Sequence, residues 1–249
     1  MLNDLLLLSG NDIPFFQAQV IVHQPTLKEI ACIGEDIFFQ GCELLNFSKD
    51  VLEEEVKISL VDKTNFDVLM SIIVDKTTQS RNSRKAVMDL LSLLFPNYQL
   101  SIGKDGFYLI QTFEDMENRY SINNDNFEIF KQIIREIFCL ERKKDDTTAY
   151  NPGNTRAAEI AKKLRKGREK AAAARNESQK ISILSRYASI LAVGEQKDLN
   201  SLMNYTVYQL YDEFQRFELK QNFDIYLQAK MAGAKDMEEV DNWMKDLHP

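Results

Sequence analysis

The chain is poor in the residues on which most catalytic sites depend. Its 249 residues include 2 histidines and 3 cysteines. His23 lies in an apolar segment and His248 is next to the last residue, so we do not expect them to share a metal ion. We interpret His23 as a polar residue at the end of a strand rather than as a general base. The glycine-rich phosphate loops, the GxSxG elbow and the HExxH motif are also missing.

These shortages lead us to expect a protein that is not an enzyme. We predict no catalytic residues, no metal ligands and no cofactor-binding residues. One class of enzyme stays open, a nuclease that uses only carboxylates and lysines, because both residue types are plentiful.

Long apolar runs and cysteine pairs are missing as well. Leu5 to Leu8 is one of the longest unbroken apolar runs, whereas a membrane-spanning helix needs about 20 apolar residues. No Lys or Arg precedes that run, so we expect no secretory signal. Cys32, Cys42 and Cys139 form no CxxC pair, which favours free thiols in a reducing cytoplasm. We therefore expect a cytoplasmic protein without a membrane partner.

The composition that remains, 44% hydrophobic and 28% charged with a net charge of −7, is typical of a soluble globular protein. We predict an α+β fold class, with a small mixed α/β N-terminal domain at residues 1–145. A polar linker at residues 146–154 contains Pro152 and Gly153. The predicted all-helical C-terminal domain, residues 155–249, begins with a basic helix.

Local signals place the N-terminal elements. Residues 15–23 predict one strand, and Thr26 with Glu29 forms a capping-box pattern that begins a helix running to about Asn46. A further helix is predicted at residues 83–95, before Pro96. Residues 98–102 and 107–112 predict a hairpin around a Gly-Lys-Asp-Gly loop, with a third short strand at 120–122. The apolar stripe of residues 127–138 predicts a helix that ends near Arg142.

The sequence predicts helix throughout the C-terminal half. A helix from about Gln179 is expected to stop at Gly194, which suits a left-handed C-cap. Asp198 is placed to cap a short helix. Thr206 and Gln209 form a second capping-box pattern, and the long helix that it begins is expected to run to about Ala232.

Residues 155–175 contain eight Lys or Arg against two Glu, in a chain that is otherwise acidic. We expect this basic helix to be exposed and to contact an acidic protein partner, which includes a second copy of this chain. Nucleic-acid binding is the weaker alternative, because the helix has no aromatic residue for base stacking. The candidate partner-binding residues on it are Arg156, Lys162, Lys163, Arg165, Lys166 and Arg168.

The long helix after Thr206 carries six aromatic residues. Aromatic residues at helical spacing are usually core, but six are more than a small bundle needs. We therefore include Tyr208, Tyr211 and Phe214 among the candidate partner-binding residues, as rigid anchors for a protein partner.

Two groups of short motifs carry a resemblance to a known family. The first is Ile13-Pro14 with residues 24–35, and the second is residues 202–214 with residues 229–235 and Trp243-Met244. Together they resemble the tail assembly chaperones of long-tailed bacteriophages and prophages. The resemblance implies a non-enzymatic morphogenesis protein in the cytoplasm of the bacterial host, which binds the tape measure protein and helps to recruit tail tube subunits.

Two alternatives stay open beside the chaperone function. The chain could be a structural virion protein of the tail or baseplate, or, as a weaker possibility, a nucleic-acid-binding accessory protein. A chaperone and a structural protein both need a folded body with an adhesive surface, so composition does not separate them.

Overall fold

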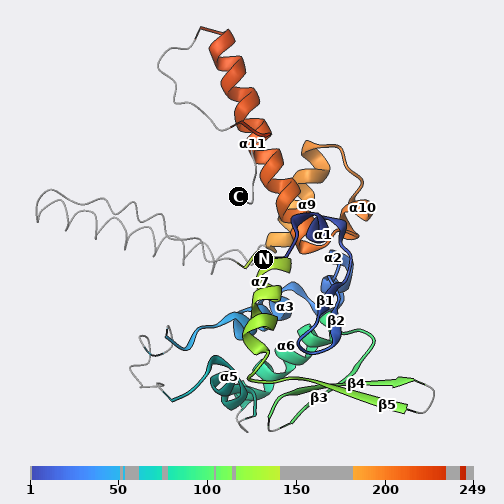
Figure 1. Ribbon diagram of the computed structural model, residues 1–249. Helices are drawn as coiled ribbons and strands as arrows, with labels where there is room; N and C mark the ends of the chain where they lie inside the picture. Colours follow the sequence, from blue (N-terminus) through green and yellow to red (C-terminus); the bar gives the residue numbers. More distant parts are fainter. Residues whose placement is uncertain are drawn as a thin grey trace, which may run out of the picture.

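The computed structural model describes residues 2–50, 53, 62–74, 78–103, 105–113, 116–140, 182–233 and 242–244. These residues form a mixed α+β fold in which two small antiparallel sheets lie among helices, and helices alone follow residue 182. Figure 1 shows the three-stranded sheet at one end of the body and the long helix α11 projecting from the other. The predicted fold class is confirmed.

The chain begins with a short capped helix and a hairpin. Helix α1 (Asp4–Ser9) is capped by the Asn3 side chain and ends at Gly10, whose φ of 68° is left-handed. Strands β1 (Ile13–Phe15) and β2 (Val20–Val22) pair antiparallel. The prediction of a single strand over residues 15–23 is therefore wrong, because the chain reverses at residues 16–19. Gln19 adopts a left-handed φ of 56° in that turn, and no Gly, Pro, Asn or Asp marks it in the sequence.

The capping box at Thr26 is confirmed, but the helix that follows is broken. The Thr26 hydroxyl accepts from the backbone N–H of Glu29, and the Glu29 carboxylate accepts from Thr26 N–H at 2.7 Å. Helix α2 (Leu27–Ile33) then ends at Gly34, and α3 (Glu35–Asn46) begins after it. Gly34 has a φ of 92°, which a helix does not allow. The predicted continuous helix to Asn46 is therefore corrected to two helices.

Helices α5 (Asn65–Val74), α6 (Thr78–Leu94) and α7 (Phe127–Ile137) complete the N-terminal half with α3. Aromatic rings join them: the Phe15 and Phe95 rings each lie 5.8 Å from the Phe130 ring. Phe66 of α5 packs against Phe127 of α7 at 5.1 Å. The apolar stripe of residues 127–138 is thus buried as core, as its helical spacing indicated.

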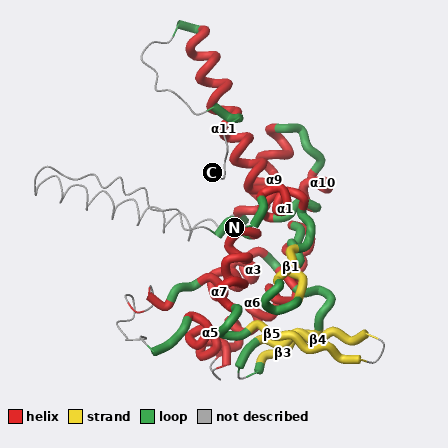
Figure 2. The backbone as a smooth tube through the Cα atoms, viewed as in Figure 1, coloured by secondary structure: helices red, strands yellow, loops and turns green. Residues whose placement is uncertain are grey.

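The predicted hairpin and third strand form one sheet, with β4 (Phe107–Phe113) between β3 (Gln99–Ile102) and β5 (Met116–Ile122). Phe107, Leu109 and Ile122 point to the helices and are buried. Because β3 pairs only with the first four residues of β4, the far part of the β4–β5 hairpin extends beyond it. Figure 2 shows this hairpin extending away from the helices.

The C-terminal part consists of α9 (Ile183–Gly194), α10 (Leu199–Met203) and α11 (Val207–Met231). The caps of α10 by Asp198 and of α11 by Thr206 with Gln209 are confirmed. Helix α9 does stop at Gly194, but the predicted left-handed cap is wrong, because the positive φ, 56°, lies at Gln196. Gly194 instead allows close packing, since a Cβ there would lie 2.4 Å from Phe217.

The helices on both sides of the predicted domain boundary share one hydrophobic core. Leu7, Phe38 and Ile134 belong to the same buried cluster as Leu191 and Leu210. The linker at residues 146–154 lies outside the described residues, so the division into two domains stays a prediction.

Candidate functional site

The two predicted groups of partner-binding residues have different outcomes. The basic group lies outside the described residues, so its exposure and its contacts stay a prediction. Its members are Arg156, Lys162, Lys163, Arg165, Lys166 and Arg168. The aromatic group lies on the first half of α11, where the structure describes every side chain.

The aromatic candidates on α11 face the body of the protein. Tyr208 is 4% exposed and Phe214 is 7% exposed. The Phe214 ring stacks on Tyr187 of α9 at 3.9 Å, and Tyr211 meets the same ring edge-on at 5.3 Å. Burial raises the pKa of half-buried Tyr211 to about 12. These placements favour a structural role over direct contact with a partner.

The first turn of α11 is attached to the N-terminal part of the chain. Thr206 forms an isolated antiparallel bridge with Thr26, and Leu27 N–H donates to the Tyr205 carbonyl at 2.9 Å. The Gln209 side-chain oxygen accepts a hydrogen bond from Thr206 N–H, and the Gln209 side-chain nitrogen donates to the Leu8 carbonyl at 2.7 Å. The capping residues of α2 and α11 therefore lie side by side, so the N-terminal residues hold the base of α11.

A second attachment fixes the start of α9. The Glu35 carboxylate accepts hydrogen bonds from the Ser182 hydroxyl and from Leu184 N–H, the latter at 3.1 Å. A carboxylate at this position also complements the positive end of the α9 dipole. The orientation of α9, and with it that of α11, therefore depends on the first turn of α3.

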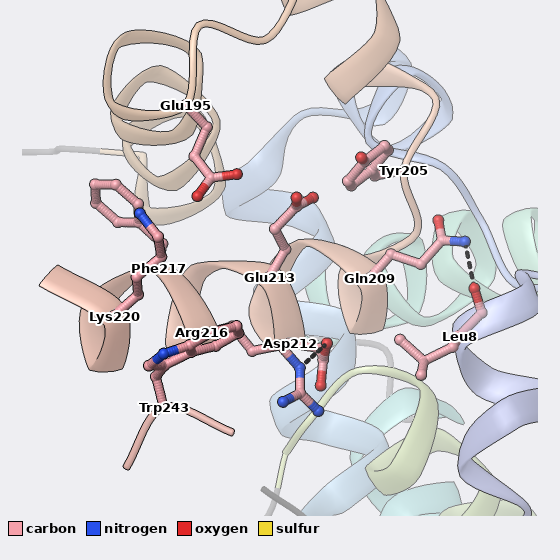
Figure 3. A pocket seen from close by; sticks show the side chains of 10 residues that line it. All are labelled: Leu8, Glu195, Tyr205, Gln209, Asp212, Glu213, Arg216, Phe217, Lys220 and Trp243. Carbon is pink, nitrogen blue, oxygen red and sulfur yellow. Dashed lines mark hydrogen bonds and ion pairs between the residues drawn. The ribbon is translucent and has the colours of Figure 1, made fainter. Parts of the chain in front are cut away.

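A groove of about 440 Å³ follows the base of α11. Figure 3 shows its lining, which combines apolar, aromatic, polar and charged side chains. They come from α1, the segment after α9, the segment before α11, α11 itself and the C-terminal segment. The lining residues are Leu8, Glu195, Tyr205, Gln209, Asp212, Glu213, Arg216, Phe217, Lys220 and Trp243. Several of these charges are paired: Arg216 lies 3.2 Å from Asp212, and Lys197 binds Glu213 and donates to the Tyr205 hydroxyl at 3.2 Å. Such a lining suits protein contact, with rigid rings and charges of both signs.

The distal half of α11 is the second unusual surface. Figure 1 shows it leaving the body, and several of its apolar side chains are exposed. Ile225 is 60% exposed, Leu227 41% and Met231 88%. Leu227 and Met231 are four residues apart and share one side of the helix. Sequence reasoning missed these residues because it concentrated on the aromatic positions; the signal that was available is that apolar residues continue on several sides of the helix after Phe217.

His23 is held between two carboxylates. Its Nδ1 lies 2.7 Å from Asp12 and its Nε2 lies 3.3 Å from Glu29. Burial alone lowers the pKa of His23, but the hydrogen bonds and charges of the two carboxylates outweigh that effect, so the pKa is raised above 6.5. The carboxylates bind opposite sides of the ring, which clamps the loop before β1 to α2. No cluster of three metal-ligating side chains is found among the residues that the structure describes.

In the described part of the chain, no helix combines the length and the apolar character needed to cross a bilayer. No curated protein and no solved structure matches the chain. Residues 176–248 match the family model described as the YomV second domain, a family associated with phages and prophages. The match contains α9, α10 and α11. The groove and the distal half of α11 thus lie largely in a segment that is similar to a phage-associated domain.

Proposed function

We propose that this protein is a phage or prophage tail assembly chaperone that acts in the cytoplasm of the bacterial host. It binds the tape measure protein and helps tail tube subunits to assemble around it. The observation that carries the proposal is the projecting distal half of α11, which exposes apolar side chains within the segment that matches a phage-associated family.

The chemistry of this surface fits a helical client. The distal half of α11 carries Glu218, Lys220, Asp224 and Lys230, so its charges balance, and Lys220 pairs with Asp224 at 3.6 Å. A balanced charge gives little attraction for a nucleic-acid backbone, which binds through an excess of Lys and Arg. Exposed apolar side chains at helical spacing instead suit pairing with the apolar face of another helix. A tape measure protein, a long helical chain, offers such faces.

The spatial arrangement of the family motifs supports the same function. Residues 24–35 and 202–214 carry most of the resemblance to tail assembly chaperones, although they are far apart in the sequence. In the structure they meet at the bridge between Thr26 and Thr206. The resemblance therefore describes one continuous region of the fold, from which α11 projects.

Co-expression with the tape measure protein tests the proposal. We expect the wild-type chain to keep the client soluble and to elute with it in size exclusion. The double variant Leu227→Glu/Met231→Glu places two charges on one exposed apolar side of α11 and should lose most of this capture. The matched control Gln221→Glu/Asn222→Glu adds the same charge at exposed polar positions of the same helix and should keep it. Equal thermal melting of the variants excludes misfolding.

A client that stays insoluble with the wild-type chain would rule out the chaperone function. The alternative, a structural protein of the tail or baseplate, is separated by mass spectrometry of purified particles. A chaperone is found in the lysate of infected cells and is missing from the finished virion, whereas a structural protein is found in both.

A further inference from the structure

The outer edge of β5 is a free strand edge on a part of the molecule that extends outward. Strand β5 pairs with β4 along its whole length, and no other described strand lies on its far side. The described residues contribute one further hydrogen bond to its backbone, from Asn126 Nδ2 to the Ser121 carbonyl at 3.0 Å. A free edge presents a row of N–H and C=O groups that can pair with another strand.

The position of this edge is well defined. On the inner face of β5, Ile122 is fully buried and the Tyr120 ring packs edge-on against Tyr98 at 6.0 Å. The sheet is therefore held against the helices by its inner face. The residues at the middle of the strand, 117 to 119, are exposed. The strand also lacks the proline and lysine residues with which proteins often protect such edges.

The charge pattern of β5 favours pairing with β5 of a second copy of the chain. Glu117 and Arg119 flank Asn118 on the strand, and both are exposed on one face, with their charged groups 3.1 Å apart. If two copies of β5 pair antiparallel about a two-fold axis at Asn118, Glu117 of each copy lies opposite Arg119 of the other. The Asn118 amides then face each other, and an amide both donates and accepts.

Neighbouring registers are disfavoured by the same charges. Directly opposed residues in an antiparallel pair have their side chains on the same face of the sheet. A two-fold axis perpendicular to the sheet must therefore lie midway between the two copies of one residue, which then face each other. An axis at Glu117 would place the two copies of Glu117 directly opposite each other, and an axis at Arg119 would do the same with the two copies of Arg119. Opposite charges directly across a strand pair stabilise it, and like charges destabilise it.

We propose that this protein forms a homodimer through antiparallel pairing of β5 with β5 of a second copy, centred on Asn118. The two three-stranded sheets join into one sheet of six strands. This interface is remote from α11, so it does not depend on the proposed chaperone function and leaves both copies of α11 free.

Charge reversal tests the register. Sedimentation velocity should show a concentration-dependent dimer for the wild-type chain. Glu117→Arg and Arg119→Glu each replace attraction by repulsion at both symmetric pairs, so each should raise the dimer dissociation constant by about tenfold or more. The double variant Glu117→Arg/Arg119→Glu restores opposite charges across the axis and should recover most of the affinity. A wild-type chain that stays monomeric at every concentration, or a double variant as weak as the singles, overturns the proposal and leaves the edge for a strand of another protein.

A cross-link tests the position of the axis. Residues directly opposite in an antiparallel pair have Cα atoms about 4.5–5.5 Å apart, which is within the range of a disulfide. In a chain with Cys32→Ser, which removes the exposed thiol, Asn118→Cys should form a disulfide-linked dimer on mild oxidation. The control Ser101→Cys, exposed on β3 and two strands away from the edge, should not. Equal cross-linking of the two variants would place the contact elsewhere and refute the interface.

Discussion

Gly41 lies at a close approach of α3 to α6, and replacing it by alanine tests that packing. A Cβ at this position would lie 2.8 Å from the Ala86 carbonyl oxygen and 3.0 Å from Leu90 Cβ. Carbon atoms in favourable contact are about 3.5–4.0 Å apart, so the helices must separate by several tenths of an ångström. Ala86 and Leu90 are both buried, and the obstructing oxygen belongs to the backbone, so a side-chain rotation cannot relieve the clash.

The expected loss is the difference between two effects. Overpacking of a core costs about 1–3 kcal/mol. Alanine regains about 1 kcal/mol over glycine from its helix propensity. We therefore expect Gly41→Ala to lower the free energy of unfolding by about 1 kcal/mol, which for a chain of this size lowers Tm by about 2–4 °C. Urea denaturation followed by circular dichroism measures the free energy, and a thermal melt measures the shift.

A second background isolates the clash from other effects of the substitution. In a Leu90→Ala chain, the Leu90 Cδ2 atom that would lie 3.1 Å from the new Cβ is gone, whereas the Ala86 oxygen and the Cβ of residue 90 remain. Gly41→Ala should therefore cost somewhat less than it does in the wild-type chain. The difference between the two costs is a coupling energy of the kind that a double-mutant cycle measures. The reasoning fails if Gly41→Ala stabilises the wild-type chain, or if its cost is the same in both backgrounds.

Three further predictions concern the attachments of the helices. Thr206→Ala should lower the free energy of unfolding by about 1 kcal/mol in urea denaturation, because α11 loses its N-cap, and Thr206→Ser should keep most of it. The raised pKa of His23 means that its ion pairs with Asp12 and Glu29 stabilise the fold fully at pH values below the unfolded pKa, near 6.5, and are lost as the pH rises through the higher folded value. The stability difference between wild type and His23→Gln should therefore shrink in urea titrations as the pH rises from below 6.5 through the raised pKa of folded His23. Residues 182–249 expressed alone should show little cooperative melting by circular dichroism, because their contacts with the first helices are absent.

Much of the secondary structure follows from signals that span four residues or fewer. The capping boxes at Thr26 and Thr206 need only a hydroxyl and a carboxylate or amide three residues later, and both form as predicted. The errors arise where a turn lacks its usual residues or a glycine has more than one possible role. Residues 16–19 reverse the chain without a glycine or proline, and Gly34 looked like an ordinary helical residue. The apolar spacing on both sides of Gly34 fits one helix as well as two.

The candidate site could be predicted only in part, because exposure depends on contacts between distant segments. The sequence singles out the helix after Thr206, and the structure confirms that helix. The sequence alone does not show that Phe214 is covered by Tyr187 of α9, or that Leu227 and Met231 extend beyond the body. Those outcomes depend on where α9 ends and how it packs, which is decided by Gly194 beside Phe217 and by the Glu35 carboxylate at the start of α9.

The helices of the segment that matches a phage-associated domain are held in place by residues much earlier in the chain. Helix α11 starts beside Thr26 and is bound through Gln209 to the carbonyl of Leu8, and the first turn of α9 is bound to the Glu35 carboxylate. Each of these contacts satisfies a polar group at a helix terminus, where the helix itself supplies no partner. A change in the first helices therefore alters the direction of α11 without touching it. In the proposed chaperone function, the N-terminal half therefore sets the direction of the surface that we propose for the client, because the base of α11 is held by residues of that half.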